Sequence, residues 1–202
     1  MSELACVVSY GDDAVTEAVV AALERDGWTV VQRLTEHDSP VRGVVYIPGL
    51  LADTIGVHSD PAGALVDLVE SLRPHLAPAA DGGARVVAVG SRDWLGWPGR
   101  PRVAAQAAAL VATVRSLALA HGRAGITVNA VIGMPADAAD RRDSGAVPGT
   151  HLYEPVPLTG EPVSPDDIAA AVTFFLDRRS GYITGQILHC CGGASLLSSL
   201  SV

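Results

Sequence analysis

The hydrophobic pattern along the chain alternates between two kinds of segment. Short continuous apolar runs are typical of strands buried on both faces of a sheet, and they lie at residues 4–9, 28–31, 43–47, 84–89, 126–132 and 186–190. Between them, apolar residues recur at helical spacing in residues 13–26, 61–76, 102–121 and 165–177. Strands that alternate with helices predict βαβ units, and therefore a parallel sheet with helices on both faces.

The ends of the helical segments carry residues that start or stop helices. Gly27 follows the first segment, and Pro61 opens the second at a tolerated first-turn position. Ser164 is a predicted N-cap, followed by the carboxylates Asp166 and Asp167 at the positive end of the helix dipole. The length of 202 residues suits one domain, and the chain has no internal repeat or linker. We therefore expect residues 1–202 to form a single domain.

Composition and charge exclude several classes of function. Hydrophobic residues make up 49% of the chain but aromatic residues only 4%, so the core must be built from Ala, Val, Leu and Ile. All 14 basic residues are arginines, and with 22 acidic residues the net charge is −8, which gives no broad attraction to nucleic acid or to an anionic membrane. The apolar runs are interrupted within about 10 residues, where a membrane-spanning helix needs about 20, and the N-terminus lacks the basic start of a signal peptide. Three cysteines give no disulfide framework, so we expect a cytoplasmic protein.

Two stretches point to a known family. Residues 115–120 and 125–131 (RSLALA, then GITVNAV) resemble the helix and sixth strand of short-chain dehydrogenases/reductases. Residues 182–188 and 192–194 (YITGQIL, then GGA) resemble that family's last strand and its Gly-Gly ending. The resemblance covers the whole chain, is strongest in its C-terminal part, and implies a Rossmann-like, doubly wound parallel sheet.

The front of the chain departs from the family pattern. The family's first turn carries three glycines that let the backbone approach a pyrophosphate, and Tyr10, Ala14 and Thr16 stand at those positions. Asp12 and Asp13 place negative charge where phosphates would sit, although an aspartate at a helix start is also an ordinary cap. Either reading predicts that this chain does not bind NAD or NADP in the usual pose.

A deletion follows the second strand. Only about 11 residues separate the strand that ends near Val31 from the one that starts near Gly43, where the family places a helix, a strand and another helix. We therefore expect a truncated sheet that lacks one strand and its flanking helices. Arg33 lies where some relatives carry an arginine for a 2′-phosphate, but a solvated arginine after a strand is the simpler reading.

The family's catalytic pair is missing as well. The family uses a tyrosine acid four residues before a lysine, and the alignment puts Val103 and Ala107 there. No shift of register restores the pair, because the chain contains no lysine; a positioned proton donor is worth roughly 10²–10⁴ in rate. Pro61 stands at the family's asparagine. Only Ser91 matches a catalytic position, and such a serine is more often a turn cap.

Other candidate chemistry is sparse. Neighbouring side chains on a strand point to opposite faces, so His189, Cys190 and Cys191 should not close on one metal ion. Cys190 reads as a small hydrophobe, whereas Cys191, at the family's acidic position, would need a nearby base to be reactive. His151 and Tyr153 belong to a loop over residues 133–160, which is either a partner-contacting loop or a loose remnant. Trp94 and Trp97 suggest a binding surface, or a cover for the core.

The family features that this chain retains are those that join subunits in the family. There, two helices per subunit form a four-helix bundle, and the last strand contacts a second neighbouring subunit. The segment 102–121 is apolar on more than one face, so one face can lie on the sheet and the other calls for a partner. The predicted interface residues are Ala104, Ala105, Ala108, Val111, Ala112 and Leu72.

The loss of the catalytic and cofactor-binding residues, together with the retention of the elements that join subunits, predicts a non-catalytic subunit. It would assemble with a full-length relative that binds NADP or NAD and carries the catalytic residues, and that could reach an acyl- or peptidyl-carrier protein. The resemblance extends to unequal reductase pairs of bacterial antibiotic pathways, some of which oxidise carrier-bound β-hydroxytyrosine. Two alternatives stay open: a homo-oligomeric ligand-binding or regulatory protein that uses the old cleft, and an enzyme of altered chemistry that uses Ser91, His151 or Cys191.

Overall fold

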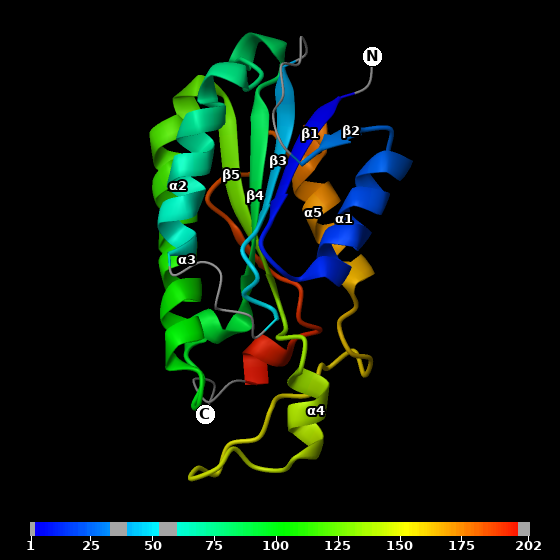
Figure 1. Ribbon diagram of the computed structural model, residues 1–202, viewed down its shortest axis with the longest axis vertical. Coiled ribbons are helices and arrows are strands. Elements are labelled where there is room, and N and C mark those ends of the chain that lie inside the picture. The colour runs from blue at the N-terminus through cyan, green and yellow to red at the C-terminus, as the bar shows by residue number, and fades with distance from the viewer. Residues whose placement is uncertain (1–2, 33–39, 53–59, 198–202) are drawn as a thin grey trace.

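The computed structural model describes residues 3–32, 40–52 and 60–197, and within them a six-stranded sheet in which every strand pair is parallel (Figure 1). The strand order is β2-β1-β3-β4-β5-β6. The strands are β1 (Leu4–Ser9), β2 (Thr29–Val31), β3 (Val41–Ile47), β4 (Ala84–Ser91), β5 (Ile126–Gly133) and β6 (Ile187–His189). The predicted parallel, doubly wound α/β sheet is confirmed.

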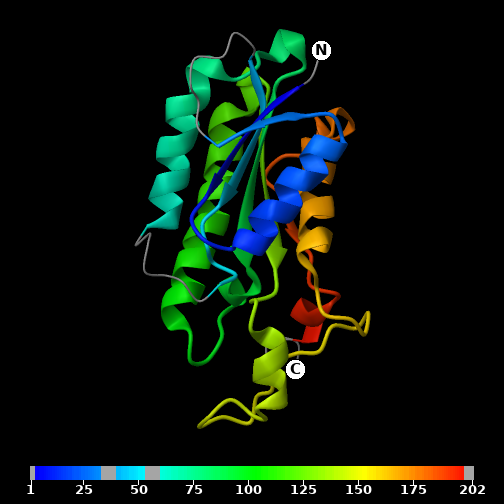
Figure 2. The ribbon, with the colours of Figure 1, turned by 45° about the vertical axis from the view of Figure 1, so that its right-hand side comes forward.

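Helices cover both faces of this sheet (Figure 2). On one side lie α2 (Pro61–Leu72) and α3 (Pro101–His121), and on the other lie α1 (Asp13–Arg25) and α5 (Pro165–Leu176). Each layer has its own core, because alternate strand residues face opposite sides. On β3, for example, Val44 and Tyr46 pack toward α2 and α3, while Val45 and Ile47 pack toward α1 and α5.

The predicted deletion falls at one edge of the sheet. Among the described strands β2 is the edge strand, and residues 32–40 alone connect it to β3. Arg33 lies outside the described residues. The chain winds from β1 to β2 in one direction and to β3 in the other, so the switch point of the sheet lies between β1 and β3. Ligand sites of open α/β sheets lie at the carboxyl ends of the strands beside such a point.

Two elements differ from the prediction. The helix expected over residues 61–76 ends at Leu72 and continues as a short 3-10 helix, η1 (Arg73–His75), because Pro74 has no N–H to donate to the helix. The loop expected over residues 133–160 contains a further helix, α4 (Ala138–Asp143).

α3 and the short 3-10 helix after it form one apolar stretch. By length and composition alone, Pro101–Ala124 would pass for a membrane span, because an 18-residue stretch within it has a mean hydropathy of 1.6, and core helices of soluble proteins pass the same test. The expectation that no segment reaches that length was therefore too strict. α3 packs against α2, β4 and β5, as a core helix of a soluble α/β domain does.

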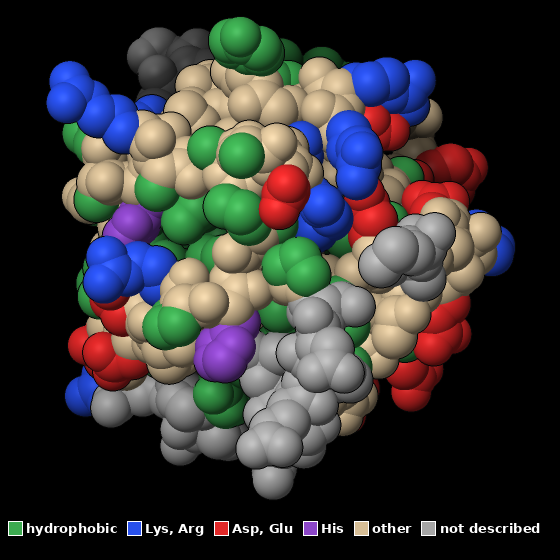
Figure 3. Space-filling model, turned by 90° about the horizontal axis from the view of Figure 1, so that it is seen from above, with side chains coloured by type: hydrophobic (Ala, Val, Ile, Leu, Met, Phe, Trp, Pro, Cys, Tyr) green, Lys and Arg blue, Asp and Glu red, His purple; other side chains and the backbone are tan. Residues whose placement is uncertain are grey.

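The end of the molecule with the amino ends of the strands is charged but mixed in sign. Figure 3 views this end and shows arginines interspersed with acidic side chains. Arg178 Nε donates to Glu3 Oε1 at 2.5 Å, and Arg42 Nε lies 3.9 Å from the same oxygen. The arginines at this end are thus matched by carboxylates, and the view shows no uniform basic surface.

Candidate functional site

The carboxyl ends of the strands and the amino ends of the helices meet at the lower end of the molecule in Figure 1, together with α4. Three groups of side chains lie in this region: Asp12 after β1, a cluster of charged residues after β4, and Cys191 with its neighbours after β6. Each group begins shortly after the last residue of a strand.

Asp12 lies at the switch point of the sheet, in the turn after β1. It is the one non-glycine residue with positive φ (57°) in the described part of the chain. Its carboxylate accepts hydrogen bonds from the Ala52 N–H and, at 3.2 Å, from the Leu51 N–H, in the turn after β3. Burial raises the pKa of Asp12, and these two hydrogen bonds act against that shift. Asp12 stands at the N-cap position of α1, but its side chain makes no cap hydrogen bond to that helix.

The residues around this turn do not suit a pyrophosphate. A phosphate approaching the start of α1 would meet the Asp12 carboxylate, which already holds the N–H groups of Leu51 and Ala52. Tyr10 packs edge-on against Tyr46 with ring centroids 6.1 Å apart, and the Thr16 hydroxyl lies 2.6 Å from that of Ser9.

The positions of the family's acid and lysine are inside the core. Val103 is 2% exposed and Ala107 0%, and both pack in the cluster between α3 and the sheet. Pro61 is the first residue of α2, and the Asp60 carboxylate caps that helix by accepting from the Gly63 N–H at 2.8 Å. At the two positions that the sequence alignment assigns to the acid and the lysine, the structure therefore has hydrophobic core contacts.

Ser91 acts as a turn cap. Its side chain is 0% exposed, and its hydroxyl accepts from the Asp93 N–H at 3.3 Å at the start of a short 3-10 helix, η3 (Arg92–Leu95). The turn-cap role predicted for this serine is the one seen in the structure. His151, the other candidate, lies exposed in the loop after α4.

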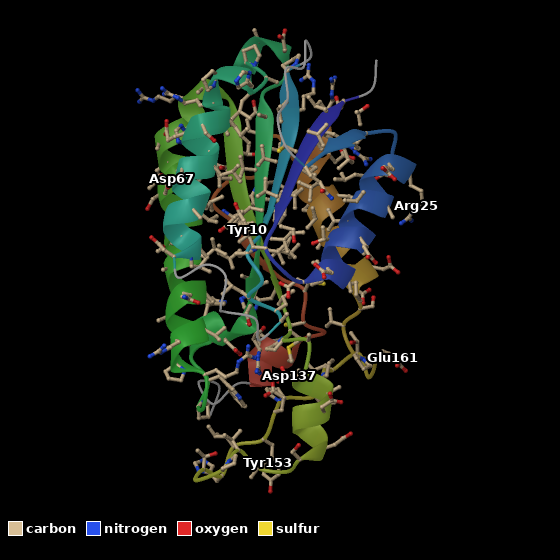
Figure 4. The ribbon with its side chains drawn as sticks, in the orientation of Figure 1. Tyr10, Arg25, Asp67, Asp137, Tyr153 and Glu161 are labelled. Carbon is tan, nitrogen blue, oxygen red and sulfur yellow. The ribbon has the colours of Figure 1, made fainter. Side chains whose placement is uncertain are left out.

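A buried ion-pair network follows β4, and the sequence analysis did not find it. Arg92 Nη2 lies 2.5 Å from Glu154 Oε1, and Arg100 Nη1 lies 3.1 Å from Asp93 Oδ2. None of these four residues is more than 9% exposed. Asp137 lies 3.8 Å from Arg100 at the partly exposed margin (Figure 4). Arg92, Asp93 and Arg100 are close in the sequence and each looks like a solvated residue, but Glu154 is 62 positions from Arg92, so only the fold brings it to them.

This ion-pair network anchors the loop over residues 133–160 to the residues after β4. Glu154 is 3% exposed, whereas its neighbour Tyr153 is 65% exposed and points away from the body of the molecule (Figure 4). Trp97 is 7% exposed, with the Arg92 guanidinium 4.7 Å from its ring centre, so this tryptophan covers the core. The loop is thus anchored through Glu154 and exposes Tyr153, Val156 and Leu158.

Cys191 has a different environment from the other two cysteines. Burial would raise its pKa, but hydrogen bonds from the His189 and Ser195 side chains and from the backbone of Ser195 and Gly193 outweigh burial and lower the pKa to about 6. The sulfur lies 3.3 Å from the Ser195 hydroxyl. Burial raises the pKa of Cys190 to about 11. His189 therefore lies beside the Cys191 thiol and helps to lower its pKa.

No group of three metal-ligating side chains occurs in the part of the chain that the structure describes. His189 also packs beside Trp94, with ring centroids 5.9 Å apart.

A pocket of about 460 Å³ opens beside Asp12. Its walls come from the start of α1, the turn after β3, the segment from Met134 through α4, and the start of α5. All its lining residues except Gly11, Asp12, Asp13 and Ser164 have apolar side chains.

The predicted interface residues divide into two groups. Val111 (4% exposed) and Leu72 (5%) are already covered by their own chain, because they face the contact between the helices and the sheet. Ala105 and Ala112 lie on the exposed side of α3, and Ala104 and Ala108 are half-buried. A partner of α3 would therefore contact the alanines rather than Val111 or Leu72.

Comparison with known proteins agrees with this architecture. Residues 62–195 match the family model described as enoyl-(acyl carrier protein) reductase. The chain is 34% identical over 183 residues to (2S)-[(R)-hydroxy(phenyl)methyl]succinyl-CoA dehydrogenase subunit BbsD of Thauera aromatica, a match that covers 88% of this chain and 64% of BbsD. It is 36% identical over 127 residues to subunit BbsC of the same dehydrogenase, covering 60% of this chain and 47% of BbsC.

Solved structures give the same fold. A short-chain dehydrogenase/reductase from Serratia marcescens superimposes with a TM-score of 0.65 at 20% identity, covering 96% of this chain and 97% of that one. The chain spans less than two thirds of the length of the curated relatives named above. The match to the family model extends over more than half of the sequence, and the chain belongs to the short-chain dehydrogenase/reductase superfamily.

Proposed function

We propose that this chain is a non-catalytic subunit that assembles with a full-length short-chain dehydrogenase/reductase, and that the partner binds NADP or NAD. The observation that carries the proposal is the core packing of Val103 and Ala107, where the family has its acid and its lysine. Asp12 adds to it, since its carboxylate takes the N–H groups beside the phosphate position.

The relatives support the idea of a paired assembly. BbsD and BbsC are named as subunits of one dehydrogenase, and both match this chain. By the same comparison, the complex would oxidise a secondary alcohol beside an aromatic ring on a thioester carrier. The substrate in the name of BbsD and BbsC, a hydroxy(phenyl)methyl group on a CoA thioester, has that chemistry. Carrier-bound β-hydroxytyrosine has the same chemistry, and we propose it as the more specific substrate of the complex.

The partner would meet the exposed face of α3, and the carrier protein would dock on the partner. A cytoplasmic location fits an assembly that uses NAD(P) and thioester substrates. The exposed small residues Ala105, Ala109 and Ala112 would let a second helix approach closely.

The test is affinity purification of the tagged chain from its native host. We expect a full-length relative to co-purify in a fixed ratio, with dehydrogenase activity in the complex and none in the isolated chain. A lone homo-oligomer would contradict the proposal. A partner complex whose activity survives substitution of the partner's own tyrosine would also contradict it.

The pocket beside Asp12 favours a second candidate function, a homo-oligomeric ligand-binding protein. That candidate predicts a stable oligomer of this chain alone that binds a small molecule without a partner.

A further inference from the structure

The pocket beside Asp12 has the size and lining of a small-molecule site. Its volume of about 460 Å³ falls within the range of ligand pockets, and its walls are mostly alanine, valine, leucine, isoleucine, methionine and proline. The Ala136 N–H donates to the Leu51 carbonyl at 2.8 Å, so the wall after β5 is tied to the wall after β3. The described residues thus form the pocket without a ligand.

The polar side chains of the lining are mostly engaged within the protein. Asp12 accepts from the N–H groups of Leu51 and Ala52. The Ser164 hydroxyl donates to the Asp167 carboxylate at 2.7 Å and accepts from the Asp167 N–H at 3.2 Å. Few directional polar contacts remain for a ligand, and van der Waals contact with apolar side chains must supply most of its binding.

The charges around the pocket disfavour an anion. Two helices, α1 and α5, begin at its walls, and the positive end of a helix dipole ordinarily attracts anions. Here each helix start already carries carboxylates of the chain, Asp12 and Asp13 at α1, and Asp166 and Asp167 at α5. No arginine lines the pocket, and the chain has no lysine.

We propose that this pocket binds an uncharged, largely apolar small molecule and discriminates against anions of the same size. The proposal does not rest on the partner-subunit function, because the pocket is complete within one chain. The two proposals can therefore fail independently: the chain can bind such a molecule without any partner, and it can assemble with a partner without binding the molecule.

The test is a fluorescence titration of the purified chain with 1-aminoanthracene, which is uncharged near neutral pH, and with 1-anthracenecarboxylate, which carries a negative charge on the same ring system. We expect saturable binding of 1-aminoanthracene to one site, and at least about tenfold weaker binding of the carboxylate, because it would lie beside Asp12. Absence of saturable binding by 1-aminoanthracene, or equal affinity for both probes, would overturn the proposal.

Two variants locate the site from opposite walls. Ala139→Phe on α4 and Ala14→Phe on α1 should each fill the pocket and weaken 1-aminoanthracene binding at least about tenfold. Ala21→Phe, on the exposed side of α1, is the matched control and should leave the affinity unchanged. Circular dichroism confirms that each variant is folded, and Ala14→Phe is the second route if Ala139→Phe fails to fold. Unchanged binding in folded pocket variants would place the probe elsewhere and overturn the assignment.

Discussion

A few residues decide the chemistry of this chain. The Asp12 carboxylate is held at the switch point of the sheet by the N–H groups of Leu51 and Ala52. Val103 and Ala107, at the positions that the sequence alignment assigns to the family's acid and lysine, make hydrophobic contacts in the core. In both places the side chain makes contacts within the protein.

The Asp12 hydrogen bonds should contribute measurably to stability. Asp12→Gly suits the positive φ but removes the acceptor for the N–H groups of Leu51 and Ala52. Leaving these partly buried donors without a partner should cost about 1–3 kcal/mol of unfolding free energy, measured by urea denaturation. Asp12→Asn, which keeps one side-chain carbonyl, should lose less than Asp12→Gly. Equal stability of wild type and Asp12→Gly would show that these bonds contribute nothing.

Cys191 should be the one cysteine of the three that is ionised at neutral pH. Its pKa is lowered from 9.0 to about 6, whereas burial raises that of Cys190 to about 11 and also raises that of Cys6. The difference in thiolate ultraviolet absorbance between wild type and Cys191→Ser should therefore titrate near pH 6.

The same shift predicts a pH dependence of stability. The folded state favours the Cys191 thiolate, so its contribution should be complete above pH 9, decline as the pH falls, and be absent below about pH 6. The unfolding free energy of wild type relative to Cys191→Ser should thus rise between pH 6 and pH 9. A difference that stays constant over this range would refute the assigned environment.

At the scale of elements, the loop after β5 and the helix α3 have opposite characters. The loop is anchored by a buried ion pair and covers the carboxyl ends of the strands. α3 buries one side against the sheet and leaves small residues on the other.

The Glu154–Arg92 pair should hold the loop in place. Glu154→Ala would remove the nearer of the two carboxylates beside the buried Arg92 guanidinium and leave Asp93 at 3.8 Å, and breaking a buried pair costs up to about 3–5 kcal/mol. The loop should then become sensitive to limited proteolysis between α4 and α5. Glu161→Ala, at an exposed position nearer α5, should change stability by less than about 0.5 kcal/mol. A similar effect of the two substitutions would disprove the anchoring role.

The exposed side of α3 should contact the proposed partner. Ala112→Glu would place a charge on this side without disturbing the core, because Ala112 is exposed. We expect loss of co-purification with the full-length relative and a melting temperature close to that of wild type. Ala21→Glu, at an exposed position of α1, should retain the complex. A complex that tolerates Ala112→Glu would move the interface away from α3.

At the scale of the whole molecule, the sequence could predict the architecture but only part of the site. The strands and main helices follow from apolar runs and helical spacing, since burial of those residues is set by local pattern. The Arg92–Glu154 pair and the bond from Asp12 to Ala52 join residues 62 and 40 positions apart, and no local pattern reports such contacts. The pKa of Cys191 likewise depends on how β6 and the turn after it fold together.

The isolated chain should not bind NADPH at micromolar concentration. The Asp12 carboxylate lies where phosphates would approach, and the chain contributes neither a lysine nor a tyrosine at the family positions. A fluorescence titration of NADPH with the chain alone should show no saturation, whereas the complex with its partner should bind. Saturable binding by the isolated chain would mean that the first turn accepts a dinucleotide after all.

The sheet ends on both sides in strands of three residues, β2 and β6. A long, flat edge strand offers its unpaired N–H and C=O groups to the edge of another sheet, and short edges restrict such pairing. Among the described residues no strand lies beyond β2, and this edge is too short to act as a template for uncontrolled strand addition. We therefore expect association of this chain with other proteins to use side-chain contacts on its helices, where composition can select the partner.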